Sequence, residues 1–293
     1  MGKELAEKYA VARQTFEEAD ATLGMSLSRL CFEGPEDELR RTEITQPAIL
    51  TVSVATWRVL AEQGVQPAWL AGHSLGEYSA HVAAGTLSFV DAVRTVRSRG
   101  RYMQEAVPAG IGAMAAILGM DAAKVREVCT QSAQGEVCQA ANMNSPEQIV
   151  VSGNKAAVER AVALAMEQGA KKAVLLPVSA PFHCSLMQPA QERLAQDLRA
   201  LPFQNPAKPV MCNVDASPVT TADASRDALV RQVTGTVRWD DCVRNMIAKG
   251  AETFVEVGPG KVLWGLMRQI DRSKTSWQTS DEASLQKTLQ AFG

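Results

Sequence analysis

The chain has 293 residues, of which 46% are apolar and 21% are charged, and its formal net charge is −2. This composition is typical of a folded globular protein and excludes a disordered or fibrous one. The small net charge gives no reason to expect nucleic acid or an anionic membrane as a partner. No stretch approaches the roughly 18 apolar residues of a membrane-spanning helix.

The six cysteines are scattered along the chain, and none stands in a C-x-x-C pair. This spacing fits buried thiols in a reducing compartment better than disulfides or a zinc site. Three dispersed histidines are also too few to indicate a metal site, so we expect no metal. The first twenty residues form a charged amphipathic pattern without the apolar run of a signal peptide. We therefore expect a cytoplasmic protein.

Segments with helical periodicity alternate along the chain with short apolar or β-branched runs. We expect helices over 3–22, 45–62, 88–107, 186–199 and 239–249, and strands over 68–71, 209–214 and 252–257. Alternating strands and helices are typical of an α/β domain with a mainly parallel sheet.

The middle of the chain predicts a second unit with the order βαββαβ, the signature of a ferredoxin-like fold. Its expected elements are a strand (113–118), a helix opened by Asp121 (121–133), two strands joined by a turn at 144–146 (137–143 and 148–153), a helix ended by Gly169 (156–169) and a last strand (172–179). We expect residues 110–179 to be inserted into a large domain formed by 1–109 and 180–293. A ligand is expected in the cleft between the two units.

The run Gly72-His73-Ser74-Leu75-Gly76 lies between the expected strand 68–71 and a helical stretch beginning at Glu77. A G-x-S-x-G sequence in this position predicts a nucleophile elbow, a sharp turn that exposes the serine. The backbone N–H of the next residue, Leu75, would then face the oxyanion. We interpret Ser74 as a nucleophile rather than as a serine in a structural turn.

A serine nucleophile needs a base, and elimination favours His183. His73 adjoins Ser74, so its side chain should diverge and pack beside the elbow, and His81 fits a half-buried helix residue. Ordinary α/β-hydrolases place an acid after the serine and the histidine near the C-terminus, whereas His183 lies mid-chain. Patatin-like hydrolases use an Asp-Gly pair, which this chain lacks. A Ser–His pair oriented by a neutral main-chain carbonyl fits better.

Two further patterns leave alternatives open. Arg99 is one of four arginines between Arg94 and Arg101, and by itself this run favours a solvated helix face. The run Gly258-Pro259-Gly260-Lys261 lacks the spacing of a phosphate-binding P-loop. We interpret it as a turn between a strand and a helix near the pocket.

Several motifs together resemble the malonyl-CoA:acyl-carrier-protein transacylase family. They are GHSLGEYSA, RGRYMQEAVPAGIGAMAAILG, PFHCSLM and VEVGPGKVL, with TQPAIL and NMNSPEQIVVSG extending the similarity in order over nearly the whole chain. The resemblance implies a hydrolase-like α/β domain with a ferredoxin-like insertion. It also implies transfer of malonyl from malonyl-CoA to the phosphopantetheine thiol of acyl carrier protein through a serine ester, in fatty-acid or polyketide biosynthesis. Coenzyme A then arrives as part of the substrate, and no cofactor is implied.

The resemblance also implies roles for individual residues. Ser74 would be the nucleophile and His183 the base and then the acid. The main-chain carbonyl of Gln232 would orient His183, and the Leu75 N–H would be an oxyanion donor. Arg99 would hold the free malonyl carboxylate, because a planar guanidinium binds a carboxylate through two parallel hydrogen bonds. Phe182 resembles the residue found beside the histidine in malonyl-selective members, with a packing aromatic as the alternative.

One segment of the family pattern is absent from the front of this sequence. Members open with a strand and a G-Q-G-S-Q loop whose glutamine helps form the oxyanion hole, whereas MGKELAEKY resembles the stretch after that loop. Loss of one oxyanion donor costs about 10²–10³ in rate. We expect the sequence as written to be a weakened or inactive transacylase until it is extended. A misassigned start, a shortened chain and a non-catalytic relative are the three explanations.

Two other functions stay open from the sequence. One is a serine esterase or thioesterase, in which water takes the acyl group. The other is an inactive relative that binds carrier protein without forming an ester on Ser74. Arg99 separates the first alternative from acyl transfer, because an arginine for a carboxylate favours malonyl over acetyl groups.

Overall fold

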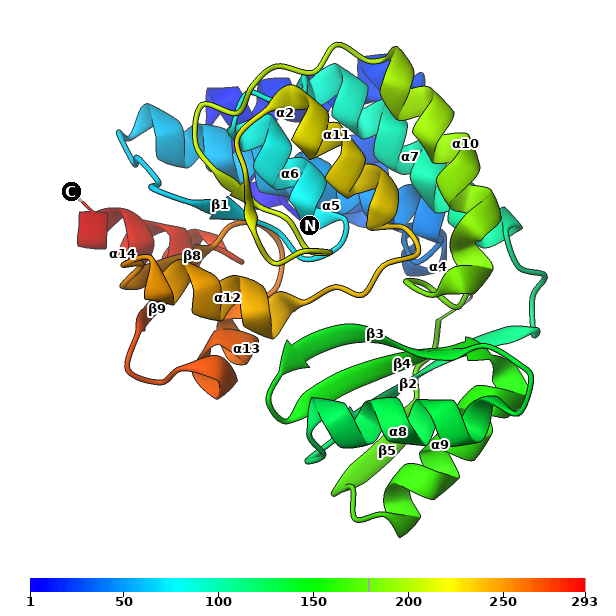
Figure 1. The fold of residues 1–293 in the computed structure, drawn as a ribbon. Coiled ribbons are helices and arrows are strands. Elements are labelled where there is room, and N and C mark those ends of the chain that lie inside the picture. The colour runs from blue at the N-terminus through cyan, green and yellow to red at the C-terminus, as the bar shows by residue number, and fades with distance from the viewer. Residues whose placement is uncertain (179, 293) are drawn as a thin grey trace.

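The computed structural model describes residues 1–178 and 180–292, which form a large body and a smaller one below it (Figure 1). The smaller body is the stretch from β2 to β5, and the chain before and after it builds the large body. Within the described residues, no helix has both the length and the apolar character to cross a membrane.

Two short sheets lie in the large body. The first contains β1 (Leu70–Ala71), β6 (Val210–Met211) and β7 (Pro218–Val219) in the order β1-β6-β7. β1 and β6 are parallel, whereas β7 runs antiparallel because only a short turn separates it from β6. The second sheet pairs β8 (Thr253–Glu256) with β9 (Thr275–Gln278) in parallel. The fold is therefore α/β with mixed sheets.

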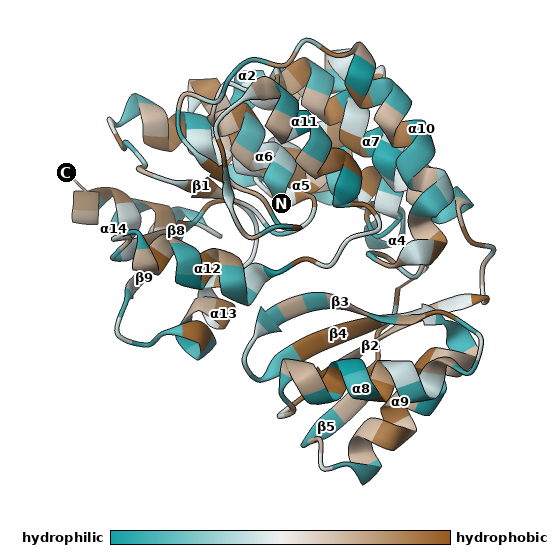
Figure 2. Cartoon of the chain, viewed as in Figure 1, coloured by the Kyte–Doolittle hydropathy of each residue, from teal (hydrophilic) through white to brown (hydrophobic). Residues whose placement is uncertain are grey.

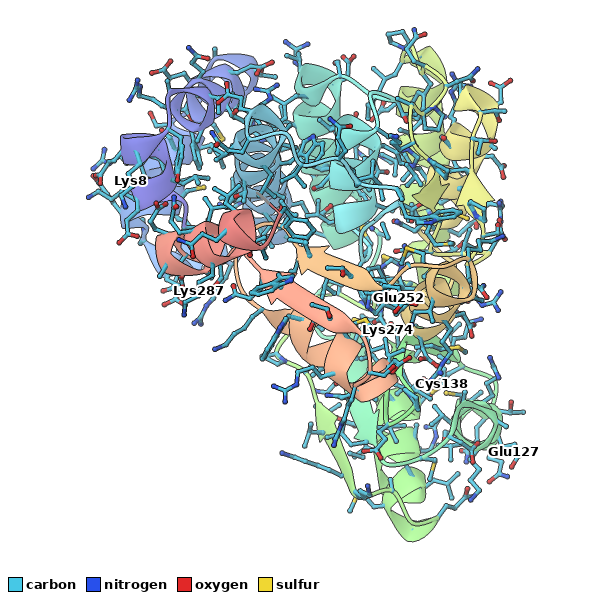
Figure 3. The ribbon with its side chains drawn as sticks, turned by 90° about the vertical axis from the view of Figure 1, so that its left-hand side faces the viewer. Lys8, Glu127, Cys138, Glu252, Lys274 and Lys287 are labelled. Carbon is cyan, nitrogen blue, oxygen red and sulfur yellow. The ribbon has the colours of Figure 1, made fainter. Side chains whose placement is uncertain are left out.

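An ion pair stands at the start of the β8–β9 pairing. Lys274 Nζ lies 2.6 Å from Glu252 Oε1, and each residue directly precedes its strand (Figure 3). The turn between β8 and α13 carries the Gly258-Pro259-Gly260-Lys261 run, as the sequence predicts. A Cβ at Gly258 would lie 2.3 Å from Ser53 Oγ, so this turn packs directly on α5.

Helices make up most of the large body. They are α1 (Lys3–Lys8), α2 (Ala10–Leu23), α3 (Leu27–Glu33), α4 (Glu36–Leu39), α5 (Thr42–Glu62), α6 (Gly76–Ala83), α7 (Phe89–Glu105), α10 (Gln188–Ala200), α11 (Ala222–Arg231), α12 (Trp239–Ala248), α13 (Val262–Ile270) and α14 (Glu282–Phe292), with a 3₁₀ turn, η1 (Ser185–Met187), before α10. The single helix expected over 3–22 is wrong, because Tyr9 has extended backbone angles (φ −116°, ψ 121°) and divides it into α1 and α2.

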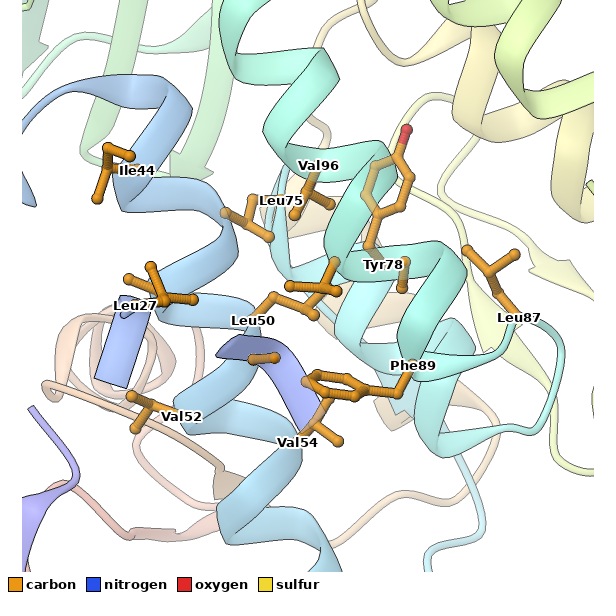
Figure 4. Close-up of a cluster of buried hydrophobic side chains, with 14 of the residues drawn as sticks. Leu27, Ile44, Leu50, Val52, Val54, Leu75, Tyr78, Leu87, Phe89 and Val96 are labelled. Carbon is orange, nitrogen blue, oxygen red and sulfur yellow. The ribbon is translucent and has the colours of Figure 1, made fainter. Parts of the chain in front are cut away.

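The main hydrophobic core joins α5, α6 and α7. Leu50 of α5 and Val96 of α7 are buried beside Leu75 and Tyr78, which come from the start of α6 (Figure 4). Full burial of side chains of this size stabilises the fold by about 1.5–3 kcal/mol each. The turn that carries Ser74 is thus fixed by apolar packing on its C-terminal side.

The smaller body has the order β2-α8-β3-β4-α9-β5. Its elements are β2 (Gly112–Leu118), α8 (Ala122–Ala133), β3 (Cys138–Ser145), β4 (Gln148–Asn154), α9 (Lys155–Glu167) and β5 (Lys172–Leu175). The sheet order is β3-β4-β2-β5, and all three pairings are antiparallel. β4 shows the apolar colour of a buried strand, whereas α8 and α9 show mixed colours (Figure 2).

Capping residues and short sequence patterns predict the elements of the smaller body, and the differences concern where individual strands end. The Asp121 side chain accepts a hydrogen bond from the Lys124 N–H and caps α8, and Gly169 takes a left-handed φ of 94° after α9. β3 continues through Ser145, so the expected turn at 144–146 starts later. β5 ends at Leu175, and the expected end at Ser179 lies outside the described residues.

The edge strand β3 joins the smaller body to the large one. Val237 N donates to Ala141 O and Met143 N donates to Val237 O, both at 2.8 Å, so Val237 pairs with β3 like one residue of a parallel strand. Thr236 Oγ1 adds a 2.7 Å hydrogen bond to Ala140 O. These bonds bring the polar end of β3, including Asn144, against the turn that holds Ser74.

Candidate active site

Ser74 lies on a sharp turn between β1 and α6. Its φ of 52° is in the left-handed region, which strains a residue with a side chain and is typical of functional turns. A Cβ on Gly72 would lie 1.9 Å from Gly76 O, so this position requires glycine. The close approach of these two backbone segments is what makes the turn sharp enough to expose Ser74.

Asn213, from the segment after β6, holds both sides of this turn. Its Oδ1 accepts a 2.6 Å hydrogen bond from Ser74 N, and its Nδ2 donates to Gly72 O at 2.8 Å. Asn213 is fully buried, so these bonds are shielded from water. The strained conformation of Ser74 is therefore maintained by a side chain far away in the sequence.

Ser74 and His183 form a hydrogen-bonded pair. Ser74 Oγ lies 2.7 Å from His183 Nε2, and His183 Nδ1 lies 2.9 Å from the main-chain oxygen of Gln232. A carbonyl oxygen only accepts hydrogen bonds, so Nδ1 carries the proton and Nε2 is free to accept the serine proton. His183 lies on the loop before η1 and also has a left-handed φ, 58°.

The electrostatic surroundings keep His183 neutral. Burial and then the positive charge of Arg99 lower the pKa of His183 to about 3, although the hydrogen bond to Gln232 O opposes the shift. The imidazole is 4% exposed. His183 therefore enters a reaction as an unprotonated base.

Arg99 lies next to the Ser–His pair and is 2% exposed. Its Nη2 donates to Ser74 Oγ at 3.1 Å and to Gln232 Oε1 at 3.0 Å, and its Nη1 donates to Gln46 Oε1 at 2.7 Å. Its Nε has no hydrogen-bond partner in the described chain. The solvated-face alternative is thus wrong for Arg99, although Arg94 and Arg101 on the same helix are exposed.

No carboxylate of the described residues forms an ion pair with Arg99. Two neutral amide oxygens hold the guanidinium, and the Glu77 carboxyl acts on it through its charge without forming an ion pair. A close approach of α7 to α5 makes this possible, because a Cβ at Gly100 would lie 2.6 Å from Thr42 O. Gly100 therefore lets α7 bring Arg99 within reach of Gln46.

These groups surround a cavity of about 170 Å³. Ser74, His183 and Arg99 line it together with Leu75 and Phe182. The further lining residues are Thr42, Gln46, His73 and Met103. Gln232 does not line the cavity but contacts three of its lining residues. The Leu75 backbone N–H donates to no backbone oxygen of the described residues, so it is available to an oxyanion.

Within the described chain, the other two histidines form no hydrogen bond with Ser74 Oγ. His73 Nε2 lies 2.8 Å from Asn144 Oδ1, and its ring packs 5.7 Å from Trp239, so it lies beside the elbow as expected. His81 is fully buried rather than half-buried, and neither ring nitrogen has a hydrogen-bond partner in the described chain. The sequence expectation for His81 is wrong because α6 lies inside the core.

Sequence reasoning missed three polar residues of the site: Gln46, Glu77 and Asn213. Gln46 stands in TQPAIL and Glu77 in GHSLGEYSA, and a polar residue among apolar helix neighbours was the available signal. No pattern near Asn213 marks it as a site residue, because the partners of its side chain and its N–H come from residues 72–77.

We expect His81 and His183 to stay neutral at pH 6. Burial is the largest cause in each case: it lowers the pKa of His73, that of His81 to about 4 and, with Arg99, that of His183 to about 3. The unfolded chain binds these protons near pH 6.5. The free energy of unfolding should therefore fall as the pH drops below 6.5.

A histidine-selective NMR titration measures this directly. The expected spectrum shows neither His81 nor His183 titrating between pH 5 and 8. A midpoint near 6.5 for His183 would contradict the neutral-base interpretation.

The fold and the site define an α/β protein in which an elbow serine is paired with a neutral histidine and faced by a buried arginine, an arrangement suited to covalent acyl transfer. The acyl transferase domain family matches residues 1–288. The chain belongs to this family.

Known relatives and solved structures are similar to this chain over nearly its whole length. The malonyl CoA-acyl carrier protein transacylase of Salmonella typhimurium is 50% identical over 287 residues, covering 98% of this chain and 93% of the relative. The solved structure of this transacylase from Coxiella burnetii has a TM-score of 0.97 at 42% identity and covers 99% of this chain and 92% of that one. A further structure, a type II PKS acyl-carrier protein in complex with its malonyl-transacylase, has a TM-score of 0.97 at 46% identity and covers 99% and 94%.

Proposed function

We propose that the chain transfers a malonyl group from malonyl-CoA to the phosphopantetheine thiol of acyl carrier protein through an ester on Ser74. The observation that carries this proposal is Arg99, a buried guanidinium 3.1 Å from Ser74 Oγ that forms no ion pair with a carboxylate of the described residues. A carboxylate two bonds beyond the reacting carbonyl would form that ion pair. The names of the relatives support the same substrate pair.

Loading begins when His183 Nε2 takes the proton of Ser74 Oγ and the oxygen attacks the thioester carbonyl. The Leu75 N–H stabilises the oxyanion, and Arg99 holds the free carboxylate through its Nε and Nη donors. The carbon–sulfur bond then breaks, and His183 returns the proton to the sulfur of coenzyme A. The result is malonyl-Ser74 and a free thiol.

Transfer repeats these steps with the carrier thiol as nucleophile. His183 accepts the thiol proton, the sulfur attacks the Ser74 ester, and the proton returns to Ser74 Oγ as the ester breaks. The carbonyl of Gln232 stabilises the protonated imidazole between these events. The proposed cycle uses no metal or cofactor, because coenzyme A and the carrier supply the thiols.

The proposal also includes the division of the chain into a large domain and an inserted subdomain. The strand order β3-β4-β2-β5 with two helices supports an inserted ferredoxin-like subdomain over 110–179, and 1–109 with 180–293 as a hydrolase-like domain. Phe182 lines the cavity and is proposed to restrict the acyl group. The cytoplasmic location stays a prediction.

A transfer assay tests the function. The purified chain is mixed with malonyl-CoA and holo acyl carrier protein, and the carrier is weighed by mass spectrometry. We expect the carrier to gain one malonyl group. Release of free malonate with an unchanged carrier would support the thioesterase alternative instead, and no turnover with intact carrier binding would support the inactive relative.

A further inference from the structure

Glu77 is a buried carboxyl in the first turn of α6, three residues after Ser74, and it has no role in the proposed loading and transfer steps. It is 0% exposed. Its Oε2 accepts hydrogen bonds from Gln232 Nε2 at 2.8 Å and from Asn213 N at 3.0 Å. Its Oε1 has no partner in the described chain. Burying a carboxyl costs free energy. The presence of this carboxyl beside the site, with two hydrogen bonds, therefore calls for an explanation.

The bond to Gln232 leads directly to the groups that face the substrate. Gln232 uses its Nε2 to bind both Glu77 and the main-chain oxygen of Ser74, the latter at 2.9 Å. Its Oε1 accepts the hydrogen bond from Arg99 Nη2, and its main-chain oxygen accepts the one from His183. One glutamine therefore contacts the nucleophile, the base and the guanidinium.

The direction of the Gln232 amide decides whether Gln232, together with Gln46, holds Arg99. A guanidinium has only donors, so it requires the oxygen end of the amide. Glu77 Oε2 is an acceptor on the opposite side and requires the nitrogen end. Because the pKa of Glu77 is raised by burial to about 7, the carboxyl can take up a proton, and the unpartnered Oε1 can carry it while Oε2 still accepts.

We propose that Glu77 is a positioning residue for acyl selectivity, which fixes the Gln232 amide with its oxygen toward Arg99 and so keeps the guanidinium beside Ser74 Oγ. This inference rests on the proposed function, since it deepens the account of how malonyl is selected. Without Glu77, the nitrogen of the Gln232 amide keeps only the Ser74 main-chain oxygen as an acceptor, so the amide turns more easily, and in the turned orientation its nitrogen would repel Arg99. Malonyl loading should suffer more than loading of an acyl group that lacks the carboxylate.

The second hydrogen bond of Glu77, which comes from Asn213 N, provides a matched control. Through Asn213 N, Glu77 also supports the turn around Ser74, and damage to that turn slows every acyl group alike. Asn213→Ala removes the bonds to Ser74 and Gly72 without touching the Gln232 amide. It should therefore lower malonyl and acetyl loading by the same factor.

The experiment compares kcat/KM for loading from malonyl-CoA and acetyl-CoA in four proteins: wild type, Glu77→Leu, Glu77→Gln and Asn213→Ala. We expect the malonyl-to-acetyl ratio to fall about ten- to hundredfold in Glu77→Leu, the range for a lost hydrogen bond to a charged network. The ratio should be restored in Glu77→Gln, whose amide oxygen can accept from Gln232, and unchanged in Asn213→Ala.

An unchanged ratio in folded Glu77→Leu overturns the inference. If that variant does not fold, Glu77→Asp replaces it, because a side chain one carbon shorter cannot reach Gln232, and an unchanged ratio there overturns the inference equally. Wild-type protein that shows no preference for malonyl-CoA would instead overturn the proposed function, so the two failures are distinguishable.

Discussion

Replacing Arg99 with alanine should lower kcat/KM for malonyl loading about a hundredfold or more and leave acetyl loading within about threefold of wild type. Removing one partner of a buried, hydrogen-bonded charge pair costs about 2–5 kcal/mol. Only malonyl places a carboxylate at the guanidinium, which is 2% exposed and unpaired with any carboxylate of the described residues. Loading rates of the two thioesters measure the effect.

Arg101→Ala is the matched control for this experiment. It removes the same side chain from the same helix, but Arg101 is exposed and pairs only with Glu105 at 4.0 Å among the described carboxylates. Surface ion pairs contribute about 0–1 kcal/mol, so loading should not change. Equal losses of malonyl and acetyl loading in Arg99→Ala would contradict a carboxylate-binding role and favour a structural one.

Replacing His183 with alanine should lower the loading rate about 10²–10⁴-fold for malonyl and acetyl groups alike, the range for loss of a general base. The histidine lies 2.7 Å from Ser74 Oγ, at the reacting end of the acyl group rather than at its carboxylate. The effect should therefore appear in kcat and leave selectivity unchanged. Single-turnover loading, followed by intact mass, measures it.

Thermal unfolding of His183→Ala provides the control for this second experiment. The variant should remain folded, because His183 contributes two hydrogen bonds at the cavity and no large apolar area. Loss of less than tenfold in a folded variant would contradict its role as the base. A malonyl-specific loss would place His183 with Arg99 in carboxylate binding.

Local sequence signals predict the parts of the fold that depend on neighbouring residues. The Asp121 cap, the Gly169 terminus and the G-x-S-x-G turn each work through contacts within a few residues, and each lies where the pattern indicates. The break at Tyr9 was missed because apolar spacing continues through it. β7 was missed because its two residues, Pro218 and Val219, stand outside any apolar run, unlike β1 and β6.

The candidate site depends on contacts between distant segments, which one sequence does not reveal. Arg99 shows the difficulty: its own helix favours a solvated face, and only the approach of α7 to α5 at Gly100 buries it. The side chain of Gln232 was missed for the same reason, since its partners are 133 to 158 positions away. The family resemblance identified its main-chain oxygen but not its amide.

The central claim is that Ser74 carries the malonyl group as an ester, and intact mass spectrometry tests it most directly. The chain and its Ser74→Ala variant are each incubated with malonyl-CoA and weighed without carrier protein. We predict that the chain gains one malonyl group and that the variant gains none. An adduct of equal yield on Ser74→Ala, or a folded chain that gains no malonyl while turning over malonyl-CoA, would contradict the claim.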